Sequence, residues 1–252
     1  MNLGAPDGWW QTLYDDAVAD ILLEREHTPN NVADFLVERL RLLPGARVFD
    51  QCCGIGSLAV PLAARGFCAV GCDLIPRYIA RAREHAQAAG VHVEFSVADA
   101  FAFAPAVPCA GAFNWWTSFG YARDDRQNLQ MLRRACESLV PGGVFALDTM
   151  NVPHVIANFQ PVVTLQRGEL SLERESALDI DAGLLHKRWT ISGAERAPIE
   201  HASTVRLHTP WELRALLLMA GFAHVELLGG IDGSPLTTAS QRCIAIATKG
   251  PA

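Results

Sequence analysis

Three acidic residues and two glycines occupy positions at which an adenosine-bearing ligand could be bound. Asp50 closes an apolar run, and Gly54 and Gly56 follow it in the stretch DQCCGIG. Asp73 and Asp99 close two later apolar runs. Glycine lets the backbone approach a ligand where a Cβ would collide, and carboxylates accept hydrogen bonds from ribose hydroxyls, amino groups or an ammonium group. These residue types at these spacings predict a site for a nucleoside-containing molecule.

The glycine loop is compatible with two classes of cofactor. Gly54, Gly56 and Ala59 satisfy the G-x-G-x-x-A spacing of dinucleotide-binding loops, and Asp73 stands at about the distance of a ribose-binding acid. Asp50, however, precedes the loop closely, where its carboxylate would repel a diphosphate and attract an ammonium group. The acid favours a cofactor with an ammonium group, and an NAD(P)-dependent dehydrogenase remains the alternative.

Each acid also has a purely structural interpretation. Asp50 and Asp73 could cap the helices that follow them, and Asp99 could be a turn residue. Three acids at the ends of three successive strands, with glycines between them, favour the ligand site over these separate explanations.

Aromatic residues form two further groups. The stretch FNWWTSFGY directly follows an expected strand and contains Trp115, Trp116 and Tyr121. A helix expected over residues 9–27 carries Trp9, Trp10 and Tyr14. Large rings also pack well in a core, but their position after the strand favours a ligand site, and we expect the N-terminal helix to cover that site as a lid.

Hydrophobic periodicity predicts the elements that position these residues. Strands are expected to end at Asp50, Asp73 and Asp99 and to include AGAFNWW and VFALDTM, with helices between them. Strands separated by helices imply right-handed crossovers and a parallel sheet covered on both faces. Ligands of such sheets bind at the carboxyl ends of the strands, where the acids are expected.

The pattern changes after residue 151. Four segments, about 161–168, 169–178, 183–192 and 199–208, alternate apolar and polar residues as antiparallel strands do. The stretch TPWELRALLLMAGF then predicts a helix with a capping box, and HVELLG and QRCIAIAT predict a closing pair of antiparallel strands.

Composition narrows the function further. The 252 residues include 21 Lys and Arg against 27 Asp and Glu, which argues against a broad nucleic-acid surface and favours a small-molecule substrate. No stretch has the pattern of a signal peptide or a membrane span, so we expect a cytoplasmic protein. We also expect a monomer or a homodimer. The seven cysteines lie mostly in apolar runs and lack paired spacing with His partners, which favours reduced, buried thiols and no metal site.

On these residues the chain resembles the class I S-adenosylmethionine-dependent methyltransferases, over about residues 32–150 and 205–248. The resemblance also extends to small-molecule members with a segment like TSFGY, a β-rich insertion after the fifth strand and a segment like GGIDGSP. It implies an α/β, Rossmann-like, seven-stranded and mostly parallel sheet with helices on both faces and an antiparallel last strand, plus an antiparallel β insertion. The expected division is a lid over 1–30, a cofactor-binding core over 31–150 and 205–252, and an insertion over 151–204 that forms part of the substrate site.

The resemblance implies S-adenosyl-L-methionine as cofactor and S-adenosyl-L-homocysteine as product. The matching glycine loop surrounds the methionyl part, Asp73 matches the acid on the ribose hydroxyls, and Asp99 matches an acid that faces adenine. The positions implied for the cofactor are Asp50, Cys52, Cys53, Gly54, Gly56, Asp73, Leu74, Asp99, Ala100, Phe101, Asn114 and Trp115. Family members often have glycine where this chain has Cys52, so the backbone there must avoid positive φ or tolerate strain.

The implied chemistry is in-line methyl transfer to nitrogen or oxygen of a small, planar aromatic or heteroaromatic metabolite, as in secondary metabolism. Stacking on the tryptophans suggests the planar acceptor, and the sequence shows no cluster of Lys or Arg for a highly anionic one. The candidate bases are His154, His201 and His208, since imidazole titrates near neutral pH. The candidate substrate residues are Trp9, Trp10, Tyr14, Trp115, Trp116, Tyr121, Asn151 and Arg188. An RNA or protein methyltransferase and a non-catalytic cofactor-binding protein are further alternatives.

Overall fold

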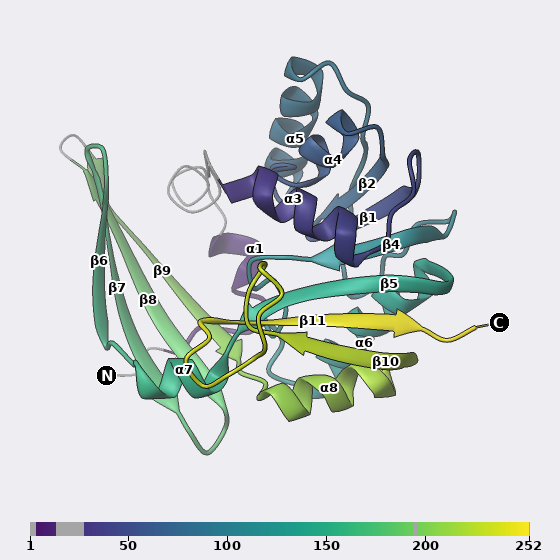
Figure 1. Cartoon of the computed structure of the whole chain (residues 1–252). Helices are drawn as coiled ribbons and strands as arrows, with labels where there is room; N and C mark the ends of the chain where they lie inside the picture. The colour runs from purple at the N-terminus through teal and green to yellow at the C-terminus, as the bar shows by residue number, and fades with distance from the viewer. Residues whose placement is uncertain (1–3, 14–27, 194–195, 252) are drawn as a thin grey trace.

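A computed structural model of the chain describes residues 4–13, 28–193 and 196–251. A larger sheet is built from β1 (Arg47–Gln51), β2 (Cys68–Asp73), β3 (Glu94–Val97), β4 (Cys109–Asn114), β5 (Leu139–Met150), β10 (Phe222–Leu228) and β11 (Arg242–Lys249). A smaller one is built from β6 (Val162–Arg167), β7 (Leu170–Asp179), β8 (Leu184–Gly193) and β9 (Arg196–Arg206). Figure 1 shows the smaller sheet standing beside the larger one.

The larger sheet has the strand order β10-β11-β5-β4-β1-β2-β3. Strands β1 to β5 are parallel to one another, whereas β11 is antiparallel to both β5 and β10. The expected seven-stranded, mostly parallel sheet with an antiparallel last strand is thereby confirmed.

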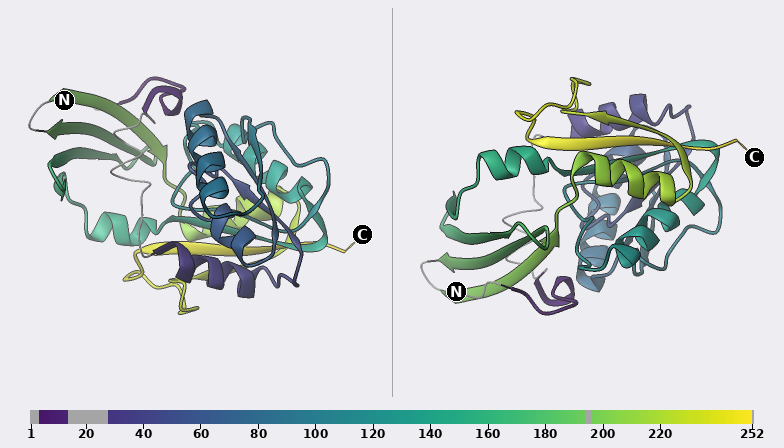
Figure 2. Two further views of the ribbon diagram at one scale, coloured as in Figure 1. Left: turned by 90° about the horizontal axis from the view of Figure 1, so that it is seen from above. Right: turned by 90° about the horizontal axis from the view of Figure 1, so that it is seen from below.

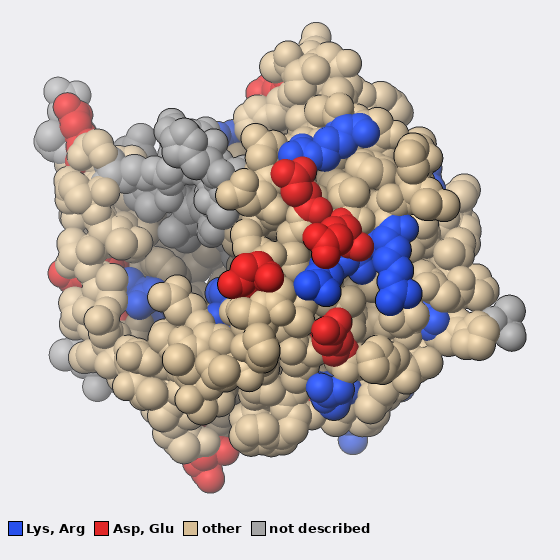
Figure 3. Space-filling model, in the orientation of Figure 1, with Lys and Arg blue, Asp and Glu red and all other residues tan. Residues whose placement is uncertain are grey.

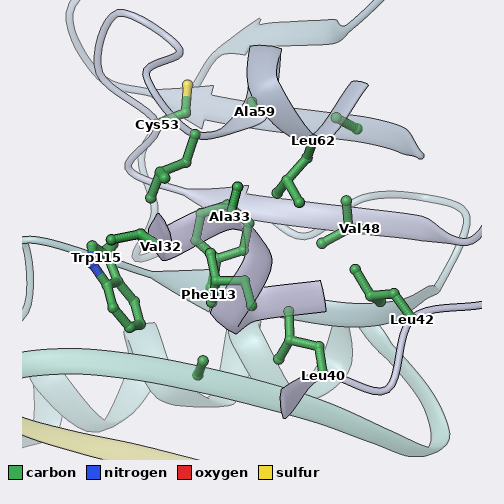
Figure 4. Close-up of a cluster of buried hydrophobic side chains, with 14 of the residues drawn as sticks. Val32, Ala33, Leu40, Leu42, Val48, Cys53, Ala59, Leu62, Phe113 and Trp115 are labelled. Atoms are coloured by element: carbon green, nitrogen blue, oxygen red, sulfur yellow. The ribbon is translucent and has the colours of Figure 1, made fainter. Parts of the chain in front are cut away.

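Helices cover both faces of this sheet, as the two views of Figure 2 show. The described helices are α1 (Trp10–Leu13), α3 (Thr28–Arg39), α4 (Ala59–Ala64), α5 (Pro76–Ala88), α6 (Asp125–Glu137), α7 (Val152–Ala157) and α8 (Pro210–Met219), of which α1 and α7 lie beside the smaller sheet instead. One core cluster joins α3, α4 and α5 to the sheet, and another joins α6 and α8 to its opposite face. In Figure 4, Val32 and Ala33 of α3 lie over Val48 and Phe113 of the strands. Of the helix expected over residues 9–27, α1 is described, and residues 14–27 lie outside the described ranges.

Local sequence signals explain where individual helices begin. At the start of α8, the Thr209 hydroxyl accepts a hydrogen bond from the Glu212 backbone N–H, and the Glu212 carboxylate accepts one from the Thr209 N–H at 2.8 Å. This is the capping box that the sequence predicts. Pro76 occupies the first turn of α5, where its missing N–H costs no hydrogen bond.

The smaller sheet is an antiparallel meander of four strands, which confirms the β-rich insertion. The short helix α7, which the sequence does not predict, precedes it. The N-terminal segment is held against the edge strand β9: the Ala5 N–H donates to the Thr204 hydroxyl at 3.0 Å, and the Trp9 indole N–H donates to the Thr204 carbonyl at 3.0 Å. Trp9 also packs with Leu172 and Ile191 in a separate core cluster.

Among the described helices, none combines the length and apolar character required to cross a membrane. All seven cysteines are unpaired, and five of them are buried.

Candidate functional site

A cavity of about 400 Å³ opens where the carboxyl edge of the larger sheet faces the smaller sheet. Loops after β1, β2, β3 and β4 form one wall, while α1 and strands β7 to β9 form the other. Residues expected at the cofactor or the acceptor that line it are Trp9, Trp10, Cys52, Cys53, Gly54, Asp73, Leu74, Asp99, Ala100, Phe101, Trp115, Trp116 and Tyr121. The fold therefore brings the two expected groups together around one space.

Asp73 at the end of β2 organises the glycine loop. Its Oδ2 accepts a hydrogen bond from the Gly54 N–H at 2.9 Å, and its Oδ1 accepts one from the Ile75 N–H at 3.0 Å. Burial raises the pKa of the Asp73 carboxyl, although these N–H groups oppose the shift. Asp99 is exposed at the cavity rim, where its Oδ1 accepts from the Phe101 N–H at 2.9 Å.

Asp50 does not line the cavity. Its side chain is buried behind the loop, near the backbone N–H of Ala59 at the start of α4. Burial, followed by the nearby charge of Asp73, raises the pKa of Asp50 well above its ordinary value. The structure thus places this acid beneath the loop rather than at its surface, and direct contact with an ammonium group stays a prediction.

Two more expected cofactor residues lie under the cavity floor. A Cβ on Gly56, which has φ +79°, would lie 3.0 Å from the Phe95 ring, so the close packing of α5 and β3 requires glycine there. Asn114 is fully buried, and its amide donates to the Gln51 side chain at 3.3 Å while its own Oδ1 has no partner within the described residues.

Cys52 adopts φ 66°, in the left-handed region that favours glycine. Of the two outcomes expected for a residue at this position, the chain thus shows the strained one. Cys52 lines the cavity, and burial raises the pKa of its thiol well above the ordinary value.

Aromatic rings make the wall opposite the glycine loop. The rings of Trp9 and Tyr121 are 4.6 Å apart between centroids, those of Trp9 and Trp10 are 5.8 Å apart, and those of Trp10 and Phe101 are 6.1 Å apart. This chain of contacts joins the N-terminal segment to the loops of the larger sheet. Tyr14, the other ring expected here, lies outside the described residues.

A strained turn follows β4 at the cavity. Trp116 and Thr117 have φ 59° and 64°, and neither is glycine. The Trp116 N–H donates to Oδ2 of Asp148 at 3.0 Å, and the Thr117 hydroxyl accepts from Arg242 at 2.7 Å. Surrounding interactions therefore hold a backbone conformation that costs free energy by itself.

The cavity residues on the smaller sheet are Arg174, Lys187, Trp189, Ser203 and Val205, and the sequence reasoning assigned none of them to the site. Burial, reinforced by the charges of Arg174 and Arg242, lowers the pKa of Lys187 to about 7. The signal that could have located them is strand alternation, because positions 187 and 189 share a face and position 188 points away.

Several expected site residues lie elsewhere. Arg188 is on the opposite face of the smaller sheet, where it pairs with Glu175 at 3.3 Å. Asn151 fixes the loop between β10 and β11, since its amide donates to the carbonyls of Thr237 and Ser240 at 2.8 and 2.6 Å. Neither residue is among those that line the cavity, so their positions give no support to a direct contact with the substrate.

The three candidate bases are dispersed. His208 is buried and contacts Asp125 at 2.9 Å, and burial lowers its pKa. His154 lies in α7 beside Asn158, and His201 lies in β9. None of the three is among the residues that line the cavity. Nor do the described ranges contain three or more His, Cys, Asp or Glu arranged to hold a metal ion.

Comparison with known proteins relates this site to a family. Residues 48–143 match the methyltransferase domain family, a stretch that includes the glycine loop, Asp73 and Asp99. A ubiquinone biosynthesis O-methyltransferase from Azorhizobium caulinodans is 30% identical over 190 residues, which cover 75% of this chain and 64% of that protein. The chain thus spans less than two thirds of the length of that relative.

Solved structures show the same fold. A methyltransferase from Clostridium acetobutylicum described as S-adenosylmethionine-dependent superposes with a TM-score of 0.79 at 14% identity, over 92% of this chain and 96% of that one. The sugar N-methyltransferase KedS8 from Streptoalloteichus superposes with a TM-score of 0.69 at 19% identity, over 99% of both chains. At this level of identity the likeness concerns the fold alone.

Proposed function

We propose that this chain, as a class I S-adenosylmethionine-dependent methyltransferase, catalyses a methyl-transfer reaction. The methyl group goes to nitrogen or oxygen of a small, planar aromatic or heteroaromatic metabolite. The observation that carries the proposal is the single cavity that has the glycine loop and Asp73 on one wall and stacked aromatic rings on the other.

The polar groups of the cavity fit the cofactor. Asp73 lines the cavity and is half-buried, and Asp50 is buried beneath the glycine loop. Both carboxyls have a raised pKa, and neither forms an ion pair with a described residue. Such carboxylates suit a ligand that brings an ammonium group and hydroxyl donors. Gly54, Asp73 and Asp99 would hold S-adenosylmethionine, which when bound supplies a methyl group already activated on a sulfonium. The dinucleotide interpretation has no comparable support, because a diphosphate would add negative charge here.

The chain itself contributes position and exclusion of water. Trp115 and Trp116 border the cavity beside the glycine loop, and the strained turn at Trp116 and Thr117 fixes their backbone. A planar acceptor would stack on rings of this wall and present its nucleophilic atom toward the glycine loop. Since no candidate histidine lines the cavity, we assign the rate chiefly to alignment and desolvation rather than to a histidine base.

The N-terminal segment acts as the lid in this proposal. Trp9, Trp10 and Leu13 line the cavity, and the hydrogen bonds to Thr204 fix the segment to the smaller sheet. Deletion of residues 1–13 should abolish turnover and spare cofactor binding, whereas a fully active truncated protein would contradict the lid.

A small molecule is preferred to RNA or a protein as the acceptor. The cavity is lined largely by apolar and aromatic groups, and on the face shown in Figure 3 basic side chains are interspersed with acidic ones. Recognition of a nucleic-acid backbone requires clustered Lys and Arg on the surface.

The first experiment is a parallel calorimetric titration of the full-length protein with S-adenosylhomocysteine, S-adenosylmethionine, NAD and NADPH. Micromolar binding of the first two and no binding of the nicotinamide cofactors is expected. A phenol or heteroaromatic amine panel with isotopically labelled S-adenosylmethionine then tests methyl acceptance. Binding of NAD or NADPH alone would overturn the proposal.

A further inference from the structure

Two cationic side chains of the smaller sheet, Arg174 and Lys187, face the cavity together. In the register of β7 and β8, Arg174 is opposite Trp189 and Ser176 is opposite Lys187. The two cations are therefore diagonal neighbours on one face of the sheet. Both lie against the same indole: the Arg174 Cζ is 5.9 Å and the Lys187 Nζ 5.5 Å from the Trp189 ring centroid.

Neither cation has an anionic partner within the described residues. Lys187 has no hydrogen bond or ion pair there, and the Nε of Arg174 is buried without an acceptor. The neighbouring cations differ. Arg242, which also lines the cavity, is neutralised by Asp148, and Arg188 on the reverse face is paired with Glu175.

Leaving two such groups unpaired is costly. Both side chains are half-buried at the cavity wall. A partly buried cation loses part of its hydration, which a counter-charge or hydrogen-bond acceptors replace, and two cations near one another add repulsion. Accordingly, burial lowers the pKa of both Arg174 and Lys187. Among the groups that face Lys187, Arg174 and Arg242 are cationic, Asp148 is already bound to Arg242, and His201 shares the sheet face from β9.

We propose that the methyl acceptor carries an anionic group, a carboxylate or a phosphate, which binds between Arg174 and Lys187 on the Trp189 wall. This inference rests on the proposed function, because it assigns the anion to the acceptor. The two cations belong to the smaller sheet, opposite the glycine loop and Asp73, so an anion held by them leaves the cofactor side of the cavity free. The sequence alone argues against a highly anionic acceptor, because its basic residues are scattered along the chain.

The test uses full-length protein saturated with S-adenosylhomocysteine and three probes of similar shape: benzoate, phenyl phosphate and uncharged benzamide. Titrations are followed by tryptophan fluorescence and by calorimetry. At least one anionic probe should bind ten times more tightly than benzamide, and the two anions together distinguish a carboxylate from a phosphate site. Equal binding of benzamide and both anions would overturn the inference.

Variants assign the effect to the two cations. Lys187→Met and Arg174→Met should each weaken the preferred anion at least tenfold, while Lys187→Arg should keep it within about threefold. Arg188→Met is the matched control, because it removes a cation from the reverse face of the same strand. Anion binding should also take up protons near pH 8 in the wild type, which appears as a dependence of the binding heat on the buffer.

Cofactor affinity separates this inference from the proposed function. Unchanged binding of S-adenosylhomocysteine in Lys187→Met and Arg174→Met is expected. A tenfold loss of that binding would show that the cations hold the carboxylate of the cofactor and would overturn the acceptor assignment. Failure of S-adenosylhomocysteine to bind the wild type would instead refute the proposed function itself.

Discussion

Asp148 and Arg242 form a two-point ion pair between β5 and β11, with Nε to Oδ1 at 2.7 Å and Nη2 to Oδ2 at 2.6 Å. The carboxylate is buried and also accepts the backbone N–H of Trp116. The same Arg242 donates to the Thr117 hydroxyl. One ion pair therefore connects the antiparallel last strand to the strained turn at the cavity, which explains how Trp116 and Thr117 keep positive φ.

Replacing Asp148 with Asn should therefore damage both stability and the acceptor side of the site. Removing one partner of a buried pair leaves Arg242 uncompensated, and we expect a loss of about 3 kcal/mol in the free energy of unfolding, measured by urea denaturation. The control is Glu94→Gln, which breaks an equally short two-point pair with Arg47 at the surface and should cost under about 1 kcal/mol. Similar losses in the two variants would contradict the role of the buried pair.

Lys187→Met should stabilise the protein, and the gain should depend on pH. The folded pKa of about 7 lies below the ordinary value of 10.5, so the penalty for the charged lysine is fully present below pH 7. It fades as pH rises toward the unfolded value, because the unfolded lysine then also loses its proton. We expect a gain of roughly 2–4 kcal/mol at pH 7, less than the approximately 5 kcal/mol that the shift converts to. Thermal unfolding at pH 7 and 9.5 measures it, and an equal gain at both pH values would contradict the buried charge.

The pattern of apolar, polar and turn residues in the sequence predicts much of this fold, because the signals for its helices and strands are local. Alternating strands and helices, the capping box at Thr209 and the four antiparallel strands after residue 151 all follow from periodicity and turn residues. The glycine loop and Asp73 are found for the same reason, since the carboxyl ends of parallel strands meet at one edge.

What the sequence misses depends on strand register. A shift of one position exchanges the faces of a strand. The sequence therefore predicts Arg188 at the substrate, whereas its neighbours Lys187 and Trp189 line the cavity. Arg174 and Lys187 are thirteen positions apart and become neighbours only through the pairing of β7 with β8. Asn151 shows a related limit, because the loop that it holds lies more than eighty residues later.

Cys52→Gly should raise stability, because the left-handed backbone at this position costs an L-residue about 1 kcal/mol. The entropy of glycine in the unfolded chain offsets part of the gain, so the expected net increase is about 0.5 kcal/mol. Cys53→Gly is the matched comparison. The Cys53 thiol packs tightly against Gly71 in the core, and Cys53 does not have a positive φ. Its replacement by glycine should therefore destabilise the protein by about 1 kcal/mol or more, because it leaves a cavity. Chemical denaturation of both variants decides the matter, and destabilisation by Cys52→Gly would show that its side chain contributes more than its strain costs.

Asp73→Ala should weaken S-adenosylhomocysteine binding by about 1.5–3 kcal/mol, since a carboxylate that hydrogen-bonds a ribose diol makes charge-assisted contacts. The same carboxylate also holds the N–H groups of Gly54 and Ile75, so part of this loss would come from a looser glycine loop. An S-adenosylhomocysteine analogue without the two ribose hydroxyls separates the two contributions, because it keeps the part that the glycine loop would hold and cannot make the diol contact. If the diol contact dominates, Asp73→Ala binds this analogue within about twofold of the wild type, whereas a looser loop weakens both ligands in proportion. Calorimetry with the two ligands supplies the comparison, and unchanged S-adenosylhomocysteine affinity in Asp73→Ala would remove this residue from the cofactor site.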